Sequence, residues 1–168
     1  ISLGAIMFGA TIIPVIAQVA PPAECDQALV YNVINGTSAS DSINGTPSND
    51  LIFGLGGSDS IDGKEGRDCI LGGDGSDDIA GGGNDDVILG GEGADSIWGN
   101  DGLDKVFGEA GADSIRAGNG NDEISGGEGP DSLRGENNND TINGDDGADS
   151  LRGGSGNDNL TGGTGMDD

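Results

Sequence analysis

A period of nine residues, repeated without an insertion or a deletion, runs from Gly36 to the end of the chain at Asp168. This stretch divides into 14 complete units and a final seven residues. Typical units read GGDGSDDIA (72–80) and GGEGPDSLR (126–134). A fixed period of this kind is typical of a solenoid, in which each unit packs against its neighbours and cannot bury its apolar face alone.

Two positions of the unit keep their character throughout. The eighth is Ile, Leu or Val in all fourteen complete units, from Ile43 to Leu160. Residues 27–35 resemble a decayed extra unit, with Asn32 and Ile34 at the sixth and eighth positions. A solvated acidic coil would not hold these positions in phase, so the pattern predicts a regular fold. The sixth position is aspartate in all fifteen units: Asp41, Asp50, Asp59, Asp68, Asp77, Asp86, Asp95, Asp104, Asp113, Asp122, Asp131, Asp140, Asp149, Asp158 and Asp167.

Each part of the unit has a physical role. Glycines at positions one, two and four let the backbone adopt positive φ and turn tightly. Such a loop can direct several carbonyl oxygens at one point, and the aspartate adds a charged oxygen. Hard oxygen ligands of this kind suit calcium, at about 2.3–2.6 Å. The last three positions predict a short β-strand whose alternation sends position eight inward and positions seven and nine outward.

The unit GGxGxDxUx, in which U is aliphatic, resembles the calcium-binding repeat of secreted hemolysin-type (RTX) proteins. The resemblance covers residues 36–168 and implies an all-β fold, a right-handed parallel β-roll with two nine-residue repeats per turn. It also implies that the position-six aspartates and loop carbonyls bind calcium between loops one full turn apart, so that Asp41 pairs with Asp59. Fifteen loops would enclose at most thirteen ions. Four loops depart from the glycine pattern: 36–40, 45–49, 81–85 and 135–139.

The charge of the chain restricts its partners. Thirty-one acidic residues against six basic ones give a formal net charge of −25, and there is no histidine. We exclude nucleic acids and anionic membranes, because both would repel such a chain. Zinc hydrolase motifs and Ser-His-Asp triads need a histidine, and neither HExxH nor GxSxG occurs. We therefore predict that the chain is not an enzyme and has no small-molecule substrate.

Calcium is also expected to be a folding partner. The inward aliphatic side chains contribute about 2–3 kcal/mol each on burial, which is far too little to order a glycine-rich backbone at about 1.5 kcal/mol per residue. Thirteen calcium ions would carry +26, which nearly cancels the formal −25. We predict that the calcium-free chain is largely unfolded and folds outside the cell, where calcium modules bind at about 10⁻⁴–10⁻³ M.

The first 23 residues carry no charge, and residues 1–20 are interpreted as a secretory signal-like hydrophobic segment. A retained membrane anchor is the alternative, since about 18–20 apolar residues can span a bilayer. Both interpretations place the remainder of the chain outside the cell. Residues 21–35 are predicted to be a lead-in and N-terminal cap, and residues 36–168 the calcium-binding β-roll.

One of the two predicted sheets begins with apolar residues on its outer face. Since a turn is two repeats, alternate repeats belong to opposite sheets, and one sheet presents Leu51/Phe53, Cys69/Leu71 and Val87/Leu89 outward. A strip of this kind calls for a cover, because large exposed apolar patches usually mark an interface. Our hypothesis is that the lead-in packs across the strip and that Cys25 and Cys69 form a disulfide. The alternative is that the strip docks another subunit or a partner domain.

The sequence predicts a secreted or extracellular calcium-binding protein with a structural or cell-surface role. Open solenoid ends also allow self-association, and a cell-surface partner is a further possibility. The alternative is a calcium-binding module of a larger secreted enzyme or toxin whose catalytic part lies outside this chain. Because the last unit stops after seven residues, we expect the chain to be a fragment of a longer protein.

Overall fold

The structure is a computed structural model that describes residues 25–26 and 31–168. The predicted signal-like segment 1–20 and most of the lead-in lie outside the described residues. In the part that the structure describes, no helix is long and apolar enough to cross a bilayer.

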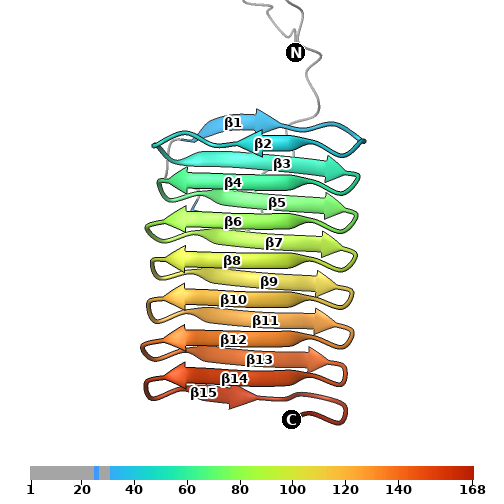
Figure 1. The fold of residues 1–168 in the computed structure, drawn as a ribbon, viewed down its shortest axis with the longest axis vertical. Coiled ribbons are helices and arrows are strands. Elements are labelled where there is room, and N and C mark those ends of the chain that lie inside the picture. The colour runs from blue at the N-terminus through green and yellow to red at the C-terminus, as the bar shows by residue number, and fades with distance from the viewer. Residues whose placement is uncertain (1–24, 27–30) are drawn as a thin grey trace, which may run out of the picture.

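Fifteen parallel β-strands stack into a β-solenoid of two facing sheets, with β1 at one end and β15 at the other (Figure 1). Odd-numbered strands form an eight-stranded sheet and even-numbered strands a seven-stranded sheet. The odd strands are β1 (Asn32–Asn35), β3 (Asp50–Gly56), β5 (Cys69–Asp74), β7 (Val87–Glu92), β9 (Lys105–Ala110), β11 (Glu123–Glu128), β13 (Thr141–Asp146) and β15 (Asn159–Thr161). The even strands are β2 (Ser42–Asn44), β4 (Ser60–Glu65), β6 (Asp78–Gly83), β8 (Ser96–Asp101), β10 (Ser114–Asn119), β12 (Ser132–Asn137) and β14 (Ser150–Ser155).

The register of both sheets is 18 residues. Ile52 lies beside Ile70 in one sheet, and Ile115 lies beside Leu133 in the other. One turn of the solenoid is therefore two repeats, and alternate repeats belong to opposite sheets. The predicted all-β architecture of two repeats per turn is confirmed.

Tight loops join the sheets, and their backbone explains the glycine pattern. Position two adopts a left-handed conformation even where the residue is not glycine, as at Leu55 with φ 79° and Lys64 with φ 83°. At position four, Gly93 has φ 132°, and a Cβ there would collide with the carbonyl oxygen of Gly75 in the previous turn. The loops lie so close together that only glycine fits many of their positions.

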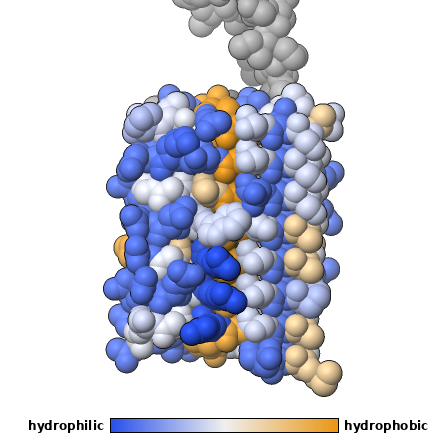
Figure 2. All heavy atoms as spheres, viewed as in Figure 1, coloured by the Kyte–Doolittle hydropathy of each residue, from blue (hydrophilic) through white to orange (hydrophobic). Residues whose placement is uncertain are grey.

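The core is the column of position-eight side chains between the two sheets. From Ile52 to Ile142 these side chains are at most 2% exposed, whereas Leu160 at the end of the stack is 42% exposed. Position eight therefore points inward, as predicted. The face of the solenoid drawn in Figure 2 is mostly hydrophilic, apart from a narrow apolar strip in orange.

A second, smaller apolar cluster lies on the outer face of the odd-numbered sheet. Cys25, Leu51 and Cys69 are buried in it, and Tyr31 and Phe53 pack against them. The described part of the lead-in thus covers the beginning of the apolar strip. Cys25 and Cys69 have Cα atoms 5.9 Å apart and sulfur atoms at bonding distance. This separation lies within the usual disulfide range of about 4.4–6.8 Å.

Candidate calcium-binding loops

The position-six aspartates line the edges of the solenoid, where each loop leads into its strand. Asp41 and Asp158 are half-buried and Asp167 is exposed. The twelve aspartates between these ends are at most 3% exposed: Asp50, Asp59, Asp68, Asp77, Asp86, Asp95, Asp104, Asp113, Asp122, Asp131, Asp140 and Asp149. Carboxylates are rarely buried without partners, so the partners of these twelve aspartates decide how their burial is tolerated.

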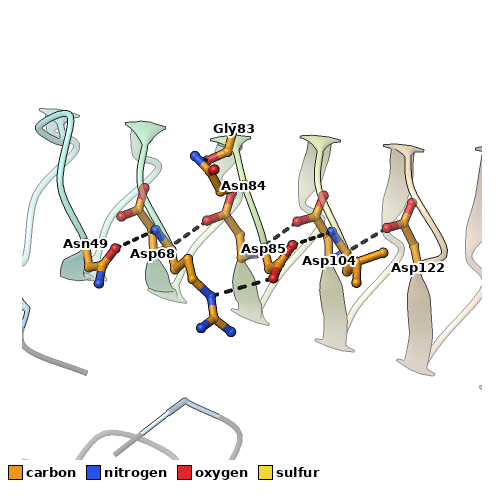
Figure 3. A network of polar contacts seen from close by, with 10 residues as sticks. Asn49, Asp68, Gly83, Asn84, Asp85, Asp104 and Asp122 are labelled. Atoms are coloured by element: carbon orange, nitrogen blue, oxygen red, sulfur yellow. Dashed lines mark hydrogen bonds and ion pairs between the residues drawn. The ribbon is translucent and has the colours of Figure 1, made fainter. Parts of the chain in front are cut away.

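One oxygen of each carboxylate is used by the protein itself. The backbone N–H of Asp77 donates to Oδ1 of Asp95, one turn further on, over 2.8 Å. The same bond recurs along both edges of the solenoid. The first joins Asp41 to Asp59, and the last joins Asp149 to Asp167. Figure 3 shows Asp68, Asp104 and Asp122 in such a row. The structure therefore brings together aspartates that are 18 residues apart, as the repeat predicts.

The other oxygen has no partner at most positions. Eleven buried Oδ2 atoms accept no hydrogen bond, those of Asp59, Asp68, Asp77, Asp86, Asp95, Asp104, Asp113, Asp122, Asp131, Asp140 and Asp149. A buried ionised carboxylate costs on the order of several kcal/mol of stability unless a cation or a donor satisfies it. Each of these atoms is a candidate ligand.

The loop leaves space beside this oxygen because position one is glycine. A Cβ at Gly90 would lie 2.5 Å from Oδ2 of Asp95 and 2.8 Å from the carbonyl oxygen of Gly108, one turn further on. A carboxylate oxygen and a carbonyl oxygen of the next loop therefore border the same space. Within the described residues no point gathers three or more acidic or cysteine side chains, so the donors that border this space are one carboxylate and the backbone carbonyls of the loops. Hard oxygen donors of this kind fit calcium.

The family comparison agrees with this chemistry. The sequence model of the RTX calcium-binding nonapeptide repeat matches the chain in four copies, at residues 35–70, 71–106, 98–133 and 134–167. The chain belongs to this family. No curated protein matches it. RTX repeats bind calcium, and their β-solenoid is a structural calcium-binding fold rather than a catalytic one.

Burial raises the pKa of nine of the RTX aspartates. It raises the pKa of Asp86 to about 8, with neighbouring Asp104 and Asp68 adding to the shift and a backbone hydrogen bond opposing it. Burial likewise raises the pKa of Asp104 to about 7. The pKa is raised to about 7 at Asp68, to about 6 at Asp95, Asp113, Asp122 and Asp131, and also upward at Asp77 and Asp140. Without a cation, burial therefore makes these nine carboxyl groups hold a proton more readily than they would in water.

Position five of the RTX unit also has a role that the repeat pattern did not suggest. The side chain of Asn49 accepts the backbone N–H of Arg67 over 2.8 Å, and Asp85 accepts that of Leu103 over 3.1 Å (Figure 3). Ser58 and Asn139 accept from the next turn in the same way. Ser, Asn or Asp occupies this position in several units. This polar bias is the signal that could have revealed the hydrogen bonds from position five to the next turn.

Proposed function

We propose that the position-six aspartates and the loop carbonyls hold calcium, and that calcium binding drives the folding of this chain. The observation that carries the proposal is the row of eleven buried Oδ2 atoms without a hydrogen-bond partner. In the calcium-loaded roll each of these oxygens faces a cation. In the calcium-free chain they oppose folding, so the binding energy of the ions becomes folding energy.

We further propose that the protein works outside the cell as a structural or cell-surface component. Extracellular calcium modules bind at about 10⁻⁴–10⁻³ M, so such a roll stays unfolded in the cytoplasm and folds on export. The signal-like composition of residues 1–20 supports this location. The placement of Cys25 beside Cys69 supports a disulfide, which an oxidising exterior would maintain.

The organisation that we propose has three parts: residues 1–20 direct export, residues 21–35 cap the first turns, and residues 36–168 bind calcium. The burial of Cys25 with Leu51 and Cys69 supports the capping role. The rigid surface of a calcium-loaded roll would then serve to hold other molecules or further copies of the chain in place.

Circular dichroism of the full chain tests the central claim. We expect little β signal in calcium-depleted buffer and a cooperative gain of β signal on titration to a few millimolar calcium. Magnesium is the control, because it requires near-ideal octahedral geometry and dehydrates reluctantly. It should produce much less signal at the same concentration. Equal β content with and without calcium would refute calcium-driven folding.

A further inference from the structure

The first two loops differ from all later ones in how their aspartate is satisfied. Both carry threonine at position two, in the sequences GTSAS and GTPSN. In the first loop the N–H and Oγ1 of Thr37 lie 2.6 Å and 2.8 Å from Oδ2 of Asp41. In the second loop the N–H and Oγ1 of Thr46 lie 2.6 Å and 3.0 Å from Oδ2 of Asp50. Each threonine donates two hydrogen bonds to the oxygen that stays unpartnered in the later turns.

The backbone of these two loops differs as well. Position two has positive φ in every unit from the third onward, beginning with Leu55 and Lys64, but not at Thr37 or Thr46. A β-branched residue strongly disfavours the left-handed conformation, so threonine itself explains the change. The threonine Oγ1 also accepts the N–H of the residue two positions later, at 3.2 Å from Ala39 and 3.3 Å from Ser48. Each of these loops is closed by its own hydrogen bonds.

The facing pairs among the remaining thirteen loops correspond in number to the eleven unpartnered oxygens. Stacked one turn apart, these loops form six facing pairs along one edge and five along the other. The eleven unpartnered Oδ2 atoms belong to the earlier aspartate of each of these pairs, from Asp59 to Asp149. Thirteen calcium sites would require Asp41 and Asp50 to offer Oδ2 to a cation as well. In both residues this oxygen already accepts hydrogen bonds from the threonine of its loop.

We propose that Thr37 and Thr46 replace calcium in the first two loops, so that the roll begins with a metal-free cap and binds eleven ions. The inference rests on the proposed calcium function. The cap coincides with the turns that the lead-in covers, since Leu51 of β3 packs with Cys25 and Cys69. These turns therefore hold their loop geometry without metal and present a formed edge on which the calcium-dependent turns stack.

Native mass spectrometry of the full chain in calcium counts the ions directly. We expect eleven on the unaltered protein. The double variant T37G/T46G restores the glycine of the later repeats and should bind one or two ions more. The variant T37S/T46S keeps both hydroxyl groups and should match the unaltered protein. More than eleven ions on the unaltered protein, or a folded T37G/T46G variant with no additional ion, would overturn the inference.

The outcome is separable from that of the proposed function. If circular dichroism shows no response to calcium, calcium-driven folding fails. If the response is present but thirteen ions bind, only the role of the threonines fails. Should T37G/T46G not fold in calcium, the ion count of the unaltered protein still decides the question.

A second inference comes from the basic residues, which divide into two groups. Lys64, Arg67 and Lys105 each pair with a carboxylate, those of Asp62, Asp85 and Glu123 respectively. By contrast, no carboxylate among the described residues lies within ion-pair distance of Arg116, Arg134 or Arg152. In a chain with 31 acidic residues, half of the six basic side chains therefore lack an acidic partner in the described structure.

These three arginines form one exposed row. They lie in register on β10, β12 and β14, and Trp98 of β8 precedes them in the same row. Strongly hydrophilic side chains, drawn in dark blue, accordingly gather in the lower half of the face shown in Figure 2. Arg134 and Arg152 line an open groove of about 280 Å³, and Glu136 lies in the same lining.

Neighbouring strands are about 4.8 Å apart, so the stacked guanidinium groups repel one another unless anions lie between them. A linear chain with regularly spaced charges would satisfy the whole row. We infer that this row binds an acidic polysaccharide, whose carboxylate or sulfate groups pair with the arginines and whose sugar rings pack on Trp98. Eleven calcium ions would carry +22 against the formal −25, so the loaded roll would keep a net charge of only −3 and repel such a ligand far less than the calcium-free chain.

Binding of chondroitin sulfate in calcium, measured by calorimetry, tests this inference. We expect R116Q/R134Q/R152Q to lose at least tenfold in affinity, whereas K64Q/R67Q/K105Q, with the same change in net charge, should lose much less. Neutral dextran should not bind. Equal losses in the two variants, no binding by the unaltered protein, or tighter binding of single-stranded poly(dT) would each overturn the inference.

Discussion

The backbone N–H of Asp86 donates a hydrogen bond to Oδ1 of Asp104 over 2.9 Å, which ties two loops one full turn apart. Oδ2 of both residues remains buried without a partner. Each carboxylate therefore joins two turns with one oxygen and leaves the other without a hydrogen-bond partner.

Replacing one interior aspartate should weaken calcium-dependent folding. In Asp95→Asn the side-chain carbonyl can still accept the N–H of Asp77, but the charge at the Oδ2 position is lost. We expect the stability at saturating calcium to fall by about 2 kcal/mol, the size of a hydrogen bond to a charged group. The midpoint of the calcium titration should move to higher calcium. Urea unfolding and calcium titration, both followed by circular dichroism, measure these changes.

The control for this variant is Asp78→Asn, which removes the same charge from an exposed side chain on β6. It lies outside the loops, so the midpoint should stay unchanged or move to lower calcium as repulsion falls. If both substitutions raise the midpoint equally, net charge rather than ligation governs folding.

Acid should partly replace calcium. Burial raises the pKa of Asp86 to about 8 and that of Asp68 to about 7, above the unfolded value of about 3.9. A raised pKa means that the folded state binds more protons, so stability is lost as pH rises from about 4 to about 8. We expect calcium-depleted protein to gain β signal in circular dichroism when the pH is lowered from 8 to 5. A signal that stays flat or falls on acidification contradicts this assignment.

The repeat alone predicted the stack because its period fixes two things at once. Strand alternation sends Ile70 inward, and the 18-residue turn places Asp68 beside Asp86. The threonine closures could not be predicted from the period, because they depend on the local backbone of Thr37 and on a hydroxyl group within reach of Asp41. The position-five bonds, such as that from Arg67 to Asn49, depend likewise on individual side chains that vary between units.

The core should be sensitive in the middle of the stack and tolerant at its end. Ile97 is fully buried on β8, between Ile79 and Ile115, so Ile97→Ala should cost about 2–5 kcal/mol of unfolding free energy in calcium. Leu160 holds the same position in its repeat but is 42% exposed, so Leu160→Ala should cost well under about 1.5 kcal/mol. Urea unfolding of both variants provides the comparison. Equal losses would mean that the inward column is not the core.

Glycine-to-alanine substitutions in the loops should differ in cost between position four and position three of the unit. Gly93 has φ 132°, and a methyl group there would collide with the carbonyl oxygen of Gly75, so Gly93→Ala should cost about 2 kcal/mol or more. At Gly56 the nearest atom to such a methyl group is the carbonyl oxygen of Asp74, at 3.7 Å, which is an ordinary contact. Gly56→Ala should therefore unfold within about 0.5 kcal/mol of the unaltered protein. A Gly93→Ala variant as stable as Gly56→Ala would contradict the loop geometry.

The cysteine pair should stabilise the first turns through a covalent link. A disulfide between Cys25 and Cys69, 44 residues apart, would reduce the conformational entropy of the unfolded chain. This would stabilise the folded state by about 4 kcal/mol. We expect no reactive thiol in the folded, non-reduced protein. Reductant should lower its stability in urea but leave the variant C25S/C69S, already weakened to a similar extent, unchanged. Two titratable thiols in the non-reduced protein would show that Cys25 and Cys69 only pack against each other.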